Sequence, residues 1–280
     1  MDRRVLAYAH QGGAWEGPSS TLHAIEAAIA GGATGIELDV HATADGHLVV
    51  CHDETVDRTT DAAGTIASFT WAELERLDNA YWWAPGADVS PGLSDESYPF
   101  RGRAPEDHRF GFARLEEVLE EFDQVVLNFD IKQTAPAVAP YEEALADMLR
   151  RYDCVDRVIV ASFLDAATET FSRYAPEFWT GAGTLAVAEF YRSIQAGDVP
   201  APMRHAALQV PHTFGDLTLV DQRFVDVAHT QGLAVHVWTI EDDQEMEELV
   251  NLGVDGIITD RPTALVEVLG RLDCAWSPVQ

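Results

Sequence analysis

The stretch GIELDVHATADGHLVVCHD, residues 35–53, looks like two buried strands, yet it carries Glu37, Asp39, His52 and Asp53 among its apolar residues. Side chains alternate between the faces of a strand, so Glu37 and Asp39 share one face while the apolar residues between them share the other. His52 and Asp53 end the second strand. Because burying a carboxylate is costly unless its charge is compensated, these groups either face solvent or face something that needs them.

Outward from this stretch, strand-like and helix-like segments alternate along the whole chain. The predicted strands are 4–10, 33–40, 124–132, 156–163, 177–183, 205–211, 233–240 and 254–260, with a hairpin arm at 47–53 after the turn Asp45-Gly46. Helix-like segments such as 21–32, 140–152 and 223–232 lie between most of them. Eight such strands predict a parallel sheet closed into one (β/α)₈ barrel domain over residues 1–280. A doubly wound open sheet is the alternative, but no GxGxxG motif follows the first strand.

Composition narrows the range of partners. The 280 residues carry 18 basic and 47 acidic side chains, a formal charge of -29, which argues against nucleic acid and anionic membranes. We expect no stable membrane insertion, because no apolar run reaches the roughly 18 residues of a membrane span. The three cysteines are far apart, no signal-peptide core is visible, and a cytoplasmic location is the simplest expectation. An anionic substrate would need a local reversal of charge, most simply a bound cation.

One segment, residues 79–114, interrupts the alternation. It is rich in proline, glycine and aromatic residues and has no clear periodicity. Its aromatic content argues against disorder. We expect an insertion over one mouth of the barrel, and the alternative is a packing flap that contacts no ligand.

Polar residues end several of the predicted strands, where barrel enzymes build their active sites. Asn128, Asp130 and Lys132 share one face of their strand, and His236 shares a face with Trp238. Three carboxylates would converge in the barrel, and all-oxygen ligands suit Mg²⁺ or Ca²⁺. The alternative is that Asp130 pairs with Lys132 or an arginine and no metal binds.

The histidines divide into two groups. His10 and His52 end strands beside polar residues and are candidates for general acid and base. The reading of His236 stays open. The remaining histidines are expected on the surface, in helices or loops: His23, His41, His47, His108, His205, His212 and His229.

Five motifs together resemble the glycerophosphodiester phosphodiesterases. They are AHQGGA (9–14), GIELDV (35–40), TADGHLVVCHDETVDRTT (43–60), VHVWT (235–239) and GVDGIITDRP (253–262). The resemblance runs from about residue 4 to residue 262. It implies a (β/α)₈ barrel, a divalent cation, and hydrolysis of a small-molecule glycerophosphodiester to glycerol 3-phosphate and an alcohol.

The resemblance also implies three sets of site residues. The catalytic pair is His10 and His52, the metal ligands are Glu37, Asp39 and Asp130, and the substrate contacts are Gln11, Lys132 and Trp238. In the family, the substrate's own glycerol hydroxyl is the nucleophile and gives a cyclic phosphate that water opens. We expect His52 to protonate the leaving alcohol and Arg58 to anchor its loop. Asp53 either orients the ring of His52 or is an exposed turn residue.

Two positions depart from the family pattern. Gln11 stands where the family has an arginine that holds the phosphate, and Pro18-Ser19-Ser20-Thr21 stands where it has Pro-Glu-Asn-Thr. Losing the arginine removes a contact of about 1.5–3 kcal/mol. Ser19 or Ser20 is expected to cap the first helix. The loss of one anionic group near the cation, through Ser19, could compensate for the loss of one cationic group near the phosphate, through Gln11.

Two other functions therefore stay open. The first is a lysophospholipase D-like phosphodiesterase in which the aromatic insertion meets an acyl chain. The second is a barrel that binds a phosphodiester without turnover. The replacements Gln11 and Ser19 are the features that favour this reading.

Overall fold

Eight parallel strands form a nearly closed barrel in the computed structural model, which describes residues 4–276. They are β1 (Leu6–His10), β2 (Gly35–Ala42), β5 (Val126–Ile131), β6 (Val158–Ala161), β7 (Trp179–Thr180), β8 (Ala207–Pro211), β11 (Ala234–Trp238) and β12 (Gly256–Thr259). Their order around the barrel is β7-β6-β5-β2-β1-β12-β11-β8. A parallel bridge between Gly181 and Ala207 closes the ring, and the amide of Ala182 donates to the carbonyl of Ala207 at 2.9 Å. The predicted (β/α)₈ architecture is confirmed.

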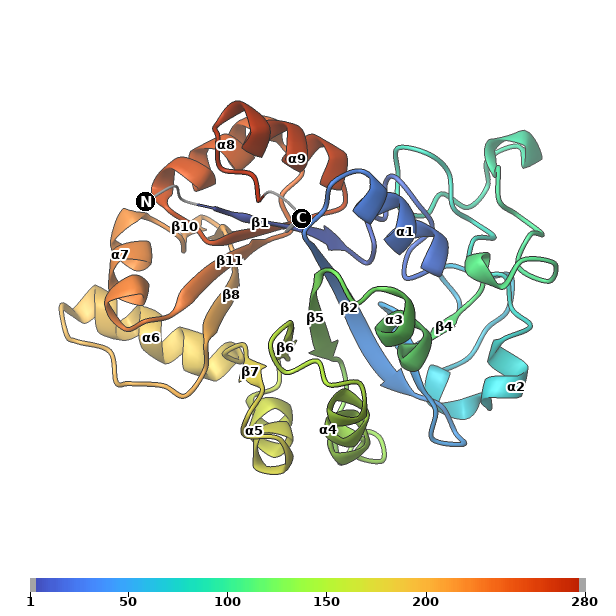
Figure 1. Cartoon of the computed structure of the whole chain (residues 1–280), viewed down its shortest axis with the longest axis horizontal. Helices are drawn as coiled ribbons and strands as arrows, with labels where there is room; N and C mark the ends of the chain where they lie inside the picture. The colour runs from blue at the N-terminus through green and yellow to red at the C-terminus, as the bar shows by residue number, and fades with distance from the viewer. Residues whose placement is uncertain (1–3, 277–280) are drawn as a thin grey trace.

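Helices surround this barrel (Figure 1). They are α1 (Leu22–Ala30), α3 (Leu115–Glu121), α4 (Glu142–Arg151), α5 (Asp165–Tyr174), α6 (Thr184–Ala196), α7 (Gln222–Thr230), α8 (Asp243–Leu252) and α9 (Pro262–Arg271), with a short α2 (Trp71–Leu74) away from the barrel wall. Between residues 4 and 276, no helix combines the length and the apolar character needed to cross a bilayer. The strand predicted over 177–183 is shorter than expected, since only Trp179 and Thr180 pair as a named strand.

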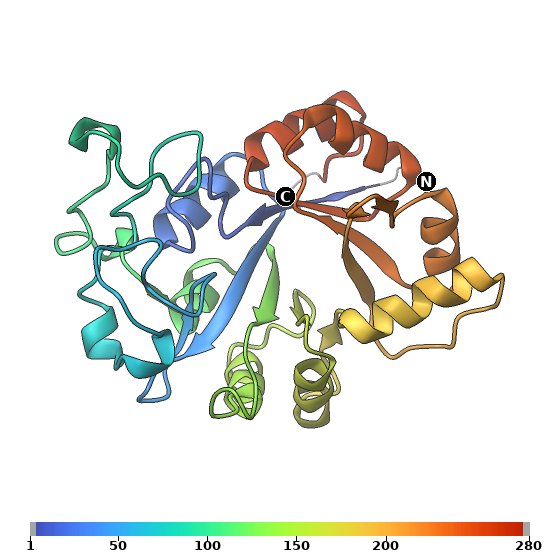
Figure 2. The ribbon, with the colours of Figure 1, turned by 180° about the vertical axis from the view of Figure 1, so that it is seen from behind.

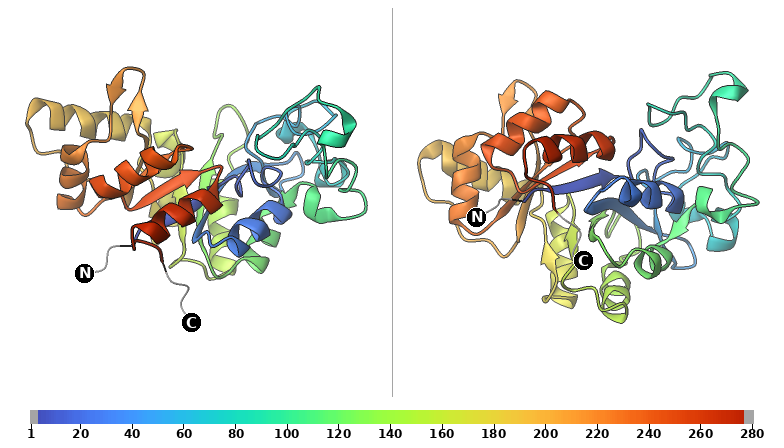
Figure 3. Two further views of the ribbon diagram at one scale, coloured as in Figure 1. Left: turned by 90° about the horizontal axis from the view of Figure 1, so that it is seen from above. Right: turned by 45° about the horizontal axis from the view of Figure 1, so that its top comes forward.

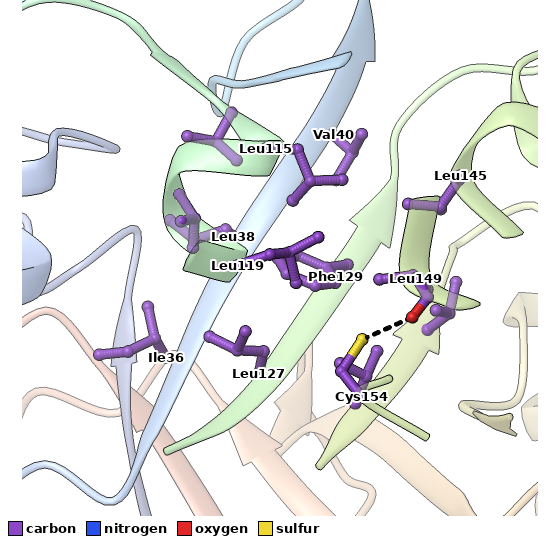
Figure 4. Close-up of a cluster of buried hydrophobic side chains, with 14 of the residues drawn as sticks. Ile36, Leu38, Val40, Leu115, Leu119, Leu127, Phe129, Leu145, Leu149 and Cys154 are labelled. Atoms are coloured by element: carbon purple, nitrogen blue, oxygen red, sulfur yellow. Dashed lines mark hydrogen bonds between the residues drawn. The ribbon is translucent and has the colours of Figure 1, made fainter. Parts of the chain in front are cut away.

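The alternation of side chains along β2 sets the two faces of the barrel wall. Ile36, Leu38 and Val40 are fully buried on the outer face. Figure 4 shows them beside Leu115 and Leu119 of α3, within the apolar cluster that extends to α4. Burial of these apolar side chains supplies the main free energy that holds helices on strands. The residues between them, Glu37 and Asp39, are therefore turned into the barrel.

The loop after β1 does not cap α1 in the way the sequence suggested. Thr21 is the N-cap, and its hydroxyl accepts from the amide of Ala24 at 3.2 Å. Ser19 instead donates its hydroxyl to the side-chain oxygen of Gln11, and Ser20 has a φ of +56°, which is not the extended backbone of an N-cap. The expectation that Ser19 or Ser20 caps the helix is wrong.

The hairpin predicted after β2 is present. β3 (Leu48–Val50) pairs antiparallel with β2 on one side and with β4 (Ala113–Arg114) on the other. Between β3 and β4 the chain makes a lobe beside α1, opposite α6 in Figures 1 and 2. The lobe contains three short 3₁₀ turns, Ile66–Ser68, Asp95–Ser97 and His108–Phe110.

Aromatic packing orders the segment 79–114 within this lobe. The guanidinium of Arg101 lies 3.7 Å from the ring centre of Tyr98 and 4.7 Å from that of Trp82. The indole of Trp83 donates to the carbonyl of Ala14 at 2.8 Å, which fastens the segment to the loop after β1. The expectation of an ordered segment near a barrel mouth therefore agrees with the structure.

A second hairpin, formed by β9 (Thr213–Phe214) and β10 (Leu217–Thr218), lies between β8 and α7. Figure 3 shows it projecting beyond the body of the barrel. Its strands are exposed, in contrast to the barrel strands.

Candidate active site

A cavity of about 560 Å³ opens at the carboxyl ends of the barrel strands. Its polar end is lined by His10, Glu37, Asp39, His52, Asn128, Asp130 and Lys132. The catalytic, metal-binding and phosphate-binding candidates from four separate segments thus face one space. The exception is Gln11, which is buried and does not line the cavity. No lining residue comes from 79–114, so the alternative of a packing flap without ligand contact describes that segment better.

The three carboxylates come from neighbouring strands in register. Asp39 of β2 pairs with Asp130 of β5, and Glu37 stands one inward position earlier on β2. All three are buried, at 2%, 7% and 7% exposure respectively. Burial and the charge of Asp39 raise the pKa of Glu37 to about 8 and that of Asp130 to about 7. The cluster therefore carries more negative charge than its surroundings can solvate.

Lys132 supplies one compensating charge. Its ammonium lies 3.0 Å from Oδ1 of Asp39 and 3.8 Å from Oδ2 of Asp130, so the ion pair considered for Asp130 is present. It leaves Oδ2 of Asp39 and Oδ1 of Asp130 buried without a hydrogen-bond partner. Buried polar atoms in native proteins are usually satisfied, so these two oxygens call for a further ligand.

The donor set suits a hard cation. Among residues 4–276, no three His, Cys, Asp or Glu side chains already converge in the arrangement of a finished metal centre. The three carboxylates nevertheless line one cavity and offer only oxygen, and two of their oxygens are unpartnered. Mg²⁺ and Ca²⁺ prefer this chemistry, and either would restore the ionised form of Glu37 and Asp130.

His10 is held by a partner from the opposite end of the chain. Its Nδ1 donates to Oδ1 of Asp260 at 2.7 Å, and its Nε2 lies 3.9 Å from Oε2 of Glu37. Burial alone would lower the pKa of His10, but the hydrogen bond and the charges of Asp260, Glu37 and Asp39 outweigh it and raise that pKa to about 9. Asp260 was not among the predicted site residues. Its place directly after a strand, in GVDGIITDRP, was the available signal.

His52 has a partner next to it in sequence. Its Nδ1 donates to Oδ1 of Asp53 at 2.7 Å, and Nε of Arg58 donates to Oδ2 of Asp53 at 2.5 Å. Burial would raise the pKa of Asp53, yet the bonds from His52 and Arg58 lower it to about 2. Arg58 also pairs with Asp88 of the inserted segment. The rings of His10 and His52 stand edge to face with centres 5.6 Å apart.

Gln11 and Ser19, the two departures from the family pattern, touch each other. The hydroxyl of Ser19 donates to Oε1 of Gln11, and Nη2 of Arg58 donates to the same oxygen at 3.3 Å. Nε2 of Gln11 lies 3.3 Å from Nε2 of His10. A neutral hydrogen-bonded pair therefore stands where the family pattern has one acid and one base. The role of Gln11 in binding substrate stays a prediction.

A polar network joins β5, β8 and β11, and two of its members, Asn128 and Gln209, line the cavity. Gln209 of β8 donates to Oδ1 of Asn128 at 3.1 Å and to Nδ1 of His236 at 3.2 Å. His236 is buried against Tyr8, with ring centres 5.2 Å apart, and burial lowers its pKa to about 4. His236 is thus neutral and structural. Gln209 was not predicted as a site residue, although its position in an inward-facing strand could have indicated it.

The remaining histidines lie mostly outside the site, as expected. His47 and His229 are exposed, and His23, His108, His205 and His212 are half-buried. His41 is the exception: it lies in β2 at 1% exposure, because this strand continues two residues beyond the predicted end. The prediction that His41 is a surface residue is wrong.

Trp238 ends β11 and lines the same cavity as the charged groups. Its ring stands edge to face with Phe163, with centres 5.4 Å apart. An aromatic side chain here can cover an apolar part of a ligand whose charged part lies among Lys132 and the histidines.

Comparison with known proteins identifies the family of the chain. Residues 10–264 match the model of the Glycerophosphoryl diester phosphodiesterase family. A protein of Caldanaerobacter subterraneus subsp. tengcongensis named "Glycerophosphodiester phosphodiesterase" is 29% identical over 274 residues, covering 96% of this chain and 99% of its own. "Lysophospholipase D GDPD1" of Homo sapiens is 26% identical, over 93% of this chain and 84% of its own.

Solved structures share the fold. A phosphodiesterase of Oleispira antarctica in complex with the product sn-glycerol-3-phosphate superposes with a TM-score of 0.72 at 23% identity, covering 95% of this chain and 96% of that one. Because the family match extends over residues 10–264, most of the sequence, the chain belongs to the glycerophosphoryl diester phosphodiesterase family, a family of phosphoric diester hydrolases.

Proposed function

We propose that the protein hydrolyses glycerophosphodiesters to glycerol 3-phosphate and an alcohol, with a divalent cation and the pair His10 and His52. The observation that carries the proposal is the single cavity lined by both histidines, three carboxylates and Lys132. A relative bearing the enzyme's name and a fold neighbour with glycerol 3-phosphate bound support it.

The cation would be held by Glu37, Asp39 and Asp130. When bound, it would neutralise the non-bridging phosphate oxygens and lower the pKa of the attacking hydroxyl or water. Lys132, the sole lysine of the sequence, contributes a second positive charge at the same end of the cavity. The chain has a net charge of -29, so the cation and Lys132 would supply the local positive charge that an anionic phosphodiester needs in order to bind.

The histidines move the protons. One imidazole takes the proton of the nucleophile, the glycerol hydroxyl of the substrate, and the other gives a proton to the departing alkoxide; each transfer contributes about 10²–10⁴ in rate. Asp260 and Asp53 hold Nδ1 of their respective rings, which leaves the two Nε2 atoms for substrate. Water then opens the cyclic phosphate with the same two groups in exchanged roles.

Trp238 covers the carbon skeleton of the glycerol. Trp238 and Lys132 line the same cavity, so a phosphate bound at Lys132 would bring the attached three-carbon unit toward the ring. This contact orients the glycerol hydroxyl toward phosphorus and excludes bulk water.

The test is incubation with glycerophosphocholine and Mg²⁺ or Ca²⁺, with and without chelator. Glycerol 3-phosphate that forms only with the metal supports the proposal, and His10→Ala and His52→Ala each lower turnover at least about a hundredfold. Product formed equally well with excess chelator would remove the cation from the proposal. No product from any glycerophosphodiester, together with binding of the intact compound, would establish the barrel as a phosphodiester-binding protein.

A lysophospholipid is the second candidate substrate. The specific observation in its favour is that the same cavity is also lined by large apolar side chains, among them Phe163, Phe214 and Leu217.

A further inference from the structure

A carboxylate outside the cavity binds Asp260, the residue that holds His10. Glu241 lies just after β11 and is half-buried. Its Oε1 accepts from the amide of Asp260 at 2.9 Å, and its Oε2 accepts from the hydroxyl of Thr259 at 3.0 Å. Glu241 does not line the cavity, so any role that it has in the reaction is exerted through other residues.

The order of the strands brings these groups together. β11 is the neighbour of β12, and β12 is the neighbour of β1. Glu241 follows β11, Asp260 follows β12, and His10 ends β1. The contacts run in the same order around the barrel, because Glu241 binds Asp260 and Asp260 accepts from Nδ1 of His10 at 2.7 Å.

The main chain of Asp260 is fixed on both sides. Its amide donates to Glu241, and its carbonyl accepts from the amide of Trp15 at 3.2 Å. Thr259, which is fully buried, donates its hydroxyl to the same carboxylate. Glu241 therefore holds two consecutive residues at the point where the chain leaves β12. Because the side chain of Asp260 extends from this point, a shift of the main chain here would move the partner of His10.

The electrostatic cost of this carboxylate indicates that both of its oxygens are needed. Burial and the charge of Asp260 raise the pKa of Glu241 to about 7, although the bonds from Asp260 and Thr259 oppose that rise. The guanidinium of Arg261 donates to the main-chain carbonyl of Glu241 and pairs with Asp243. A glutamine would present an acceptor to only one of the two donors, whereas a carboxylate accepts from both.

Resting on the function proposed above, we propose that Glu241 is a positioning residue for the reaction. It fixes the main chain after β12, and the carboxylate of Asp260 then keeps the ring of His10 with its Nε2 toward Glu37. Glu241 thus acts on the proton transfer without contact with the substrate or the cation. A misplacement of about 1 Å can cost about a hundredfold in rate, which sets the upper scale of the effect.

Proton NMR tests the positioning without any turnover. The Nδ1 protons of His10 and His52 are each hydrogen-bonded to a carboxylate, and each is assigned by its absence from the spectrum of His10→Ala or His52→Ala. At one fixed pH, we expect Glu241→Ala to remove the His10 resonance through faster exchange with water and to leave the His52 resonance unchanged. Loss of both resonances, or of neither, would overturn the proposal.

Kinetics on glycerophosphocholine with Mg²⁺ or Ca²⁺ give the second measurement. We expect Glu241→Ala to lower kcat about tenfold with KM within about twofold, and Glu241→Gln, which keeps an acceptor for the amide of Asp260, to lower kcat less. Asp243→Asn is the matched control, because it removes a nearby carboxylate at the start of α8 whose partner is the side chain of Arg261. A changed KM with an unchanged kcat in Glu241→Ala would contradict the proposal, as would an equal loss of kcat in Asp243→Asn.

A double-mutant cycle distinguishes positioning from general stability. Asp260→Ala removes the side chain through which Glu241 acts, so Glu241→Ala should lower kcat no further in that background. Additive losses would make Glu241 a stabiliser of the barrel rim and overturn the proposal. If the wild-type protein hydrolyses no glycerophosphodiester, the proposed function fails, while the NMR comparison of the two histidines still decides whether Glu241 positions His10.

Discussion

Nδ1 of His10 lies 2.7 Å from Oδ1 of Asp260, although 250 residues separate them in sequence. β1 and β12 are neighbours in the barrel, so closing the sheet brings the ends of both strands together. The amide of Asp260 in turn donates to Glu241 at 2.9 Å. The contact with Asp260 fixes the ring of His10, whose Nε2 faces Glu37.

Asp260→Asn keeps the size of the side chain and removes its charge. We expect the pKa of His10 to fall from about 9, because the carboxylate of Asp260 is among the groups that raise it, and kcat to fall about ten- to a hundredfold. NMR titration of His10 and the pH profile of kcat measure the two effects. Glu245→Gln is the control, since it removes the carboxylate beside His212, which does not line the cavity. An unchanged His10 titration in Asp260→Asn would contradict the assignment.

A substrate with an activated leaving group distinguishes the roles of the two histidines. If His52 protonates the leaving alcohol, His52→Ala loses at least about a hundredfold on glycerophosphocholine but far less on the p-nitrophenyl diester of glycerol phosphate, whose phenolate leaves unprotonated. His10→Ala loses activity on both. Initial rates on the two substrates decide it, and the opposite pattern would exchange the roles.

Gln11 and Ser19 are expected to act as one unit. Gln11→Arg alone brings a second guanidinium beside Arg58, and Ser19→Glu alone adds a carboxylate with no arginine at position 11. The double variant restores an opposite-charge pair, so we expect a coupling energy of about 1–2 kcal/mol in kcat/KM. A double-mutant cycle measures it, and additive effects would count against compensation between the two positions.

The inserted segment supports His52 through Asp88. Asp88 pairs with Arg58, and Arg58 holds the carboxylate that orients His52. Asp88→Asn should lower kcat about three- to tenfold with little change in KM, because the ring loses its fixed position. Asp95→Asn is the control. Asp95 lies in the same segment and pairs with Arg101, but its carboxylate is exposed to solvent. If both substitutions lowered kcat equally, Asp88 would only stabilise the lobe and would not position His52.

The affinity of the site for a divalent cation should increase as the pH rises. The pKa values of Glu37 and Asp130, about 8 and about 7, mean that both carboxyls hold protons near pH 6 and that a cation must displace them. Affinity for Mg²⁺ or Ca²⁺ therefore rises from about pH 6 to about pH 8.5, while fewer protons are released per ion bound. Calorimetry in buffers of different ionisation enthalpy measures both. Binding without pH dependence or proton release would place the ion elsewhere.

Much of the fold could be predicted from the sequence because its signals are local. The eight barrel strands lie where apolar runs predicted them, and the two-residue period of β2 correctly placed Glu37 and Asp39 inside and Ile36 and Leu38 outside. Short elements were harder to predict. The strand at 177–183 shrank to two residues, and the cap of α1 moved to Thr21, because ring closure and loop contacts outweigh local preference there.

The sequence by itself determined which chemical groups are available and on which face of each strand they lie, since side-chain direction follows from backbone geometry alone. Only the tertiary structure decided which groups meet: Asp260 beside His10, Ser19 against Gln11, and α6 with the β9–β10 hairpin around the same cavity. These contacts depend on barrel closure and on how helices and loops pack over the strand ends. No local pattern encodes a distance between segments that are far apart in the chain.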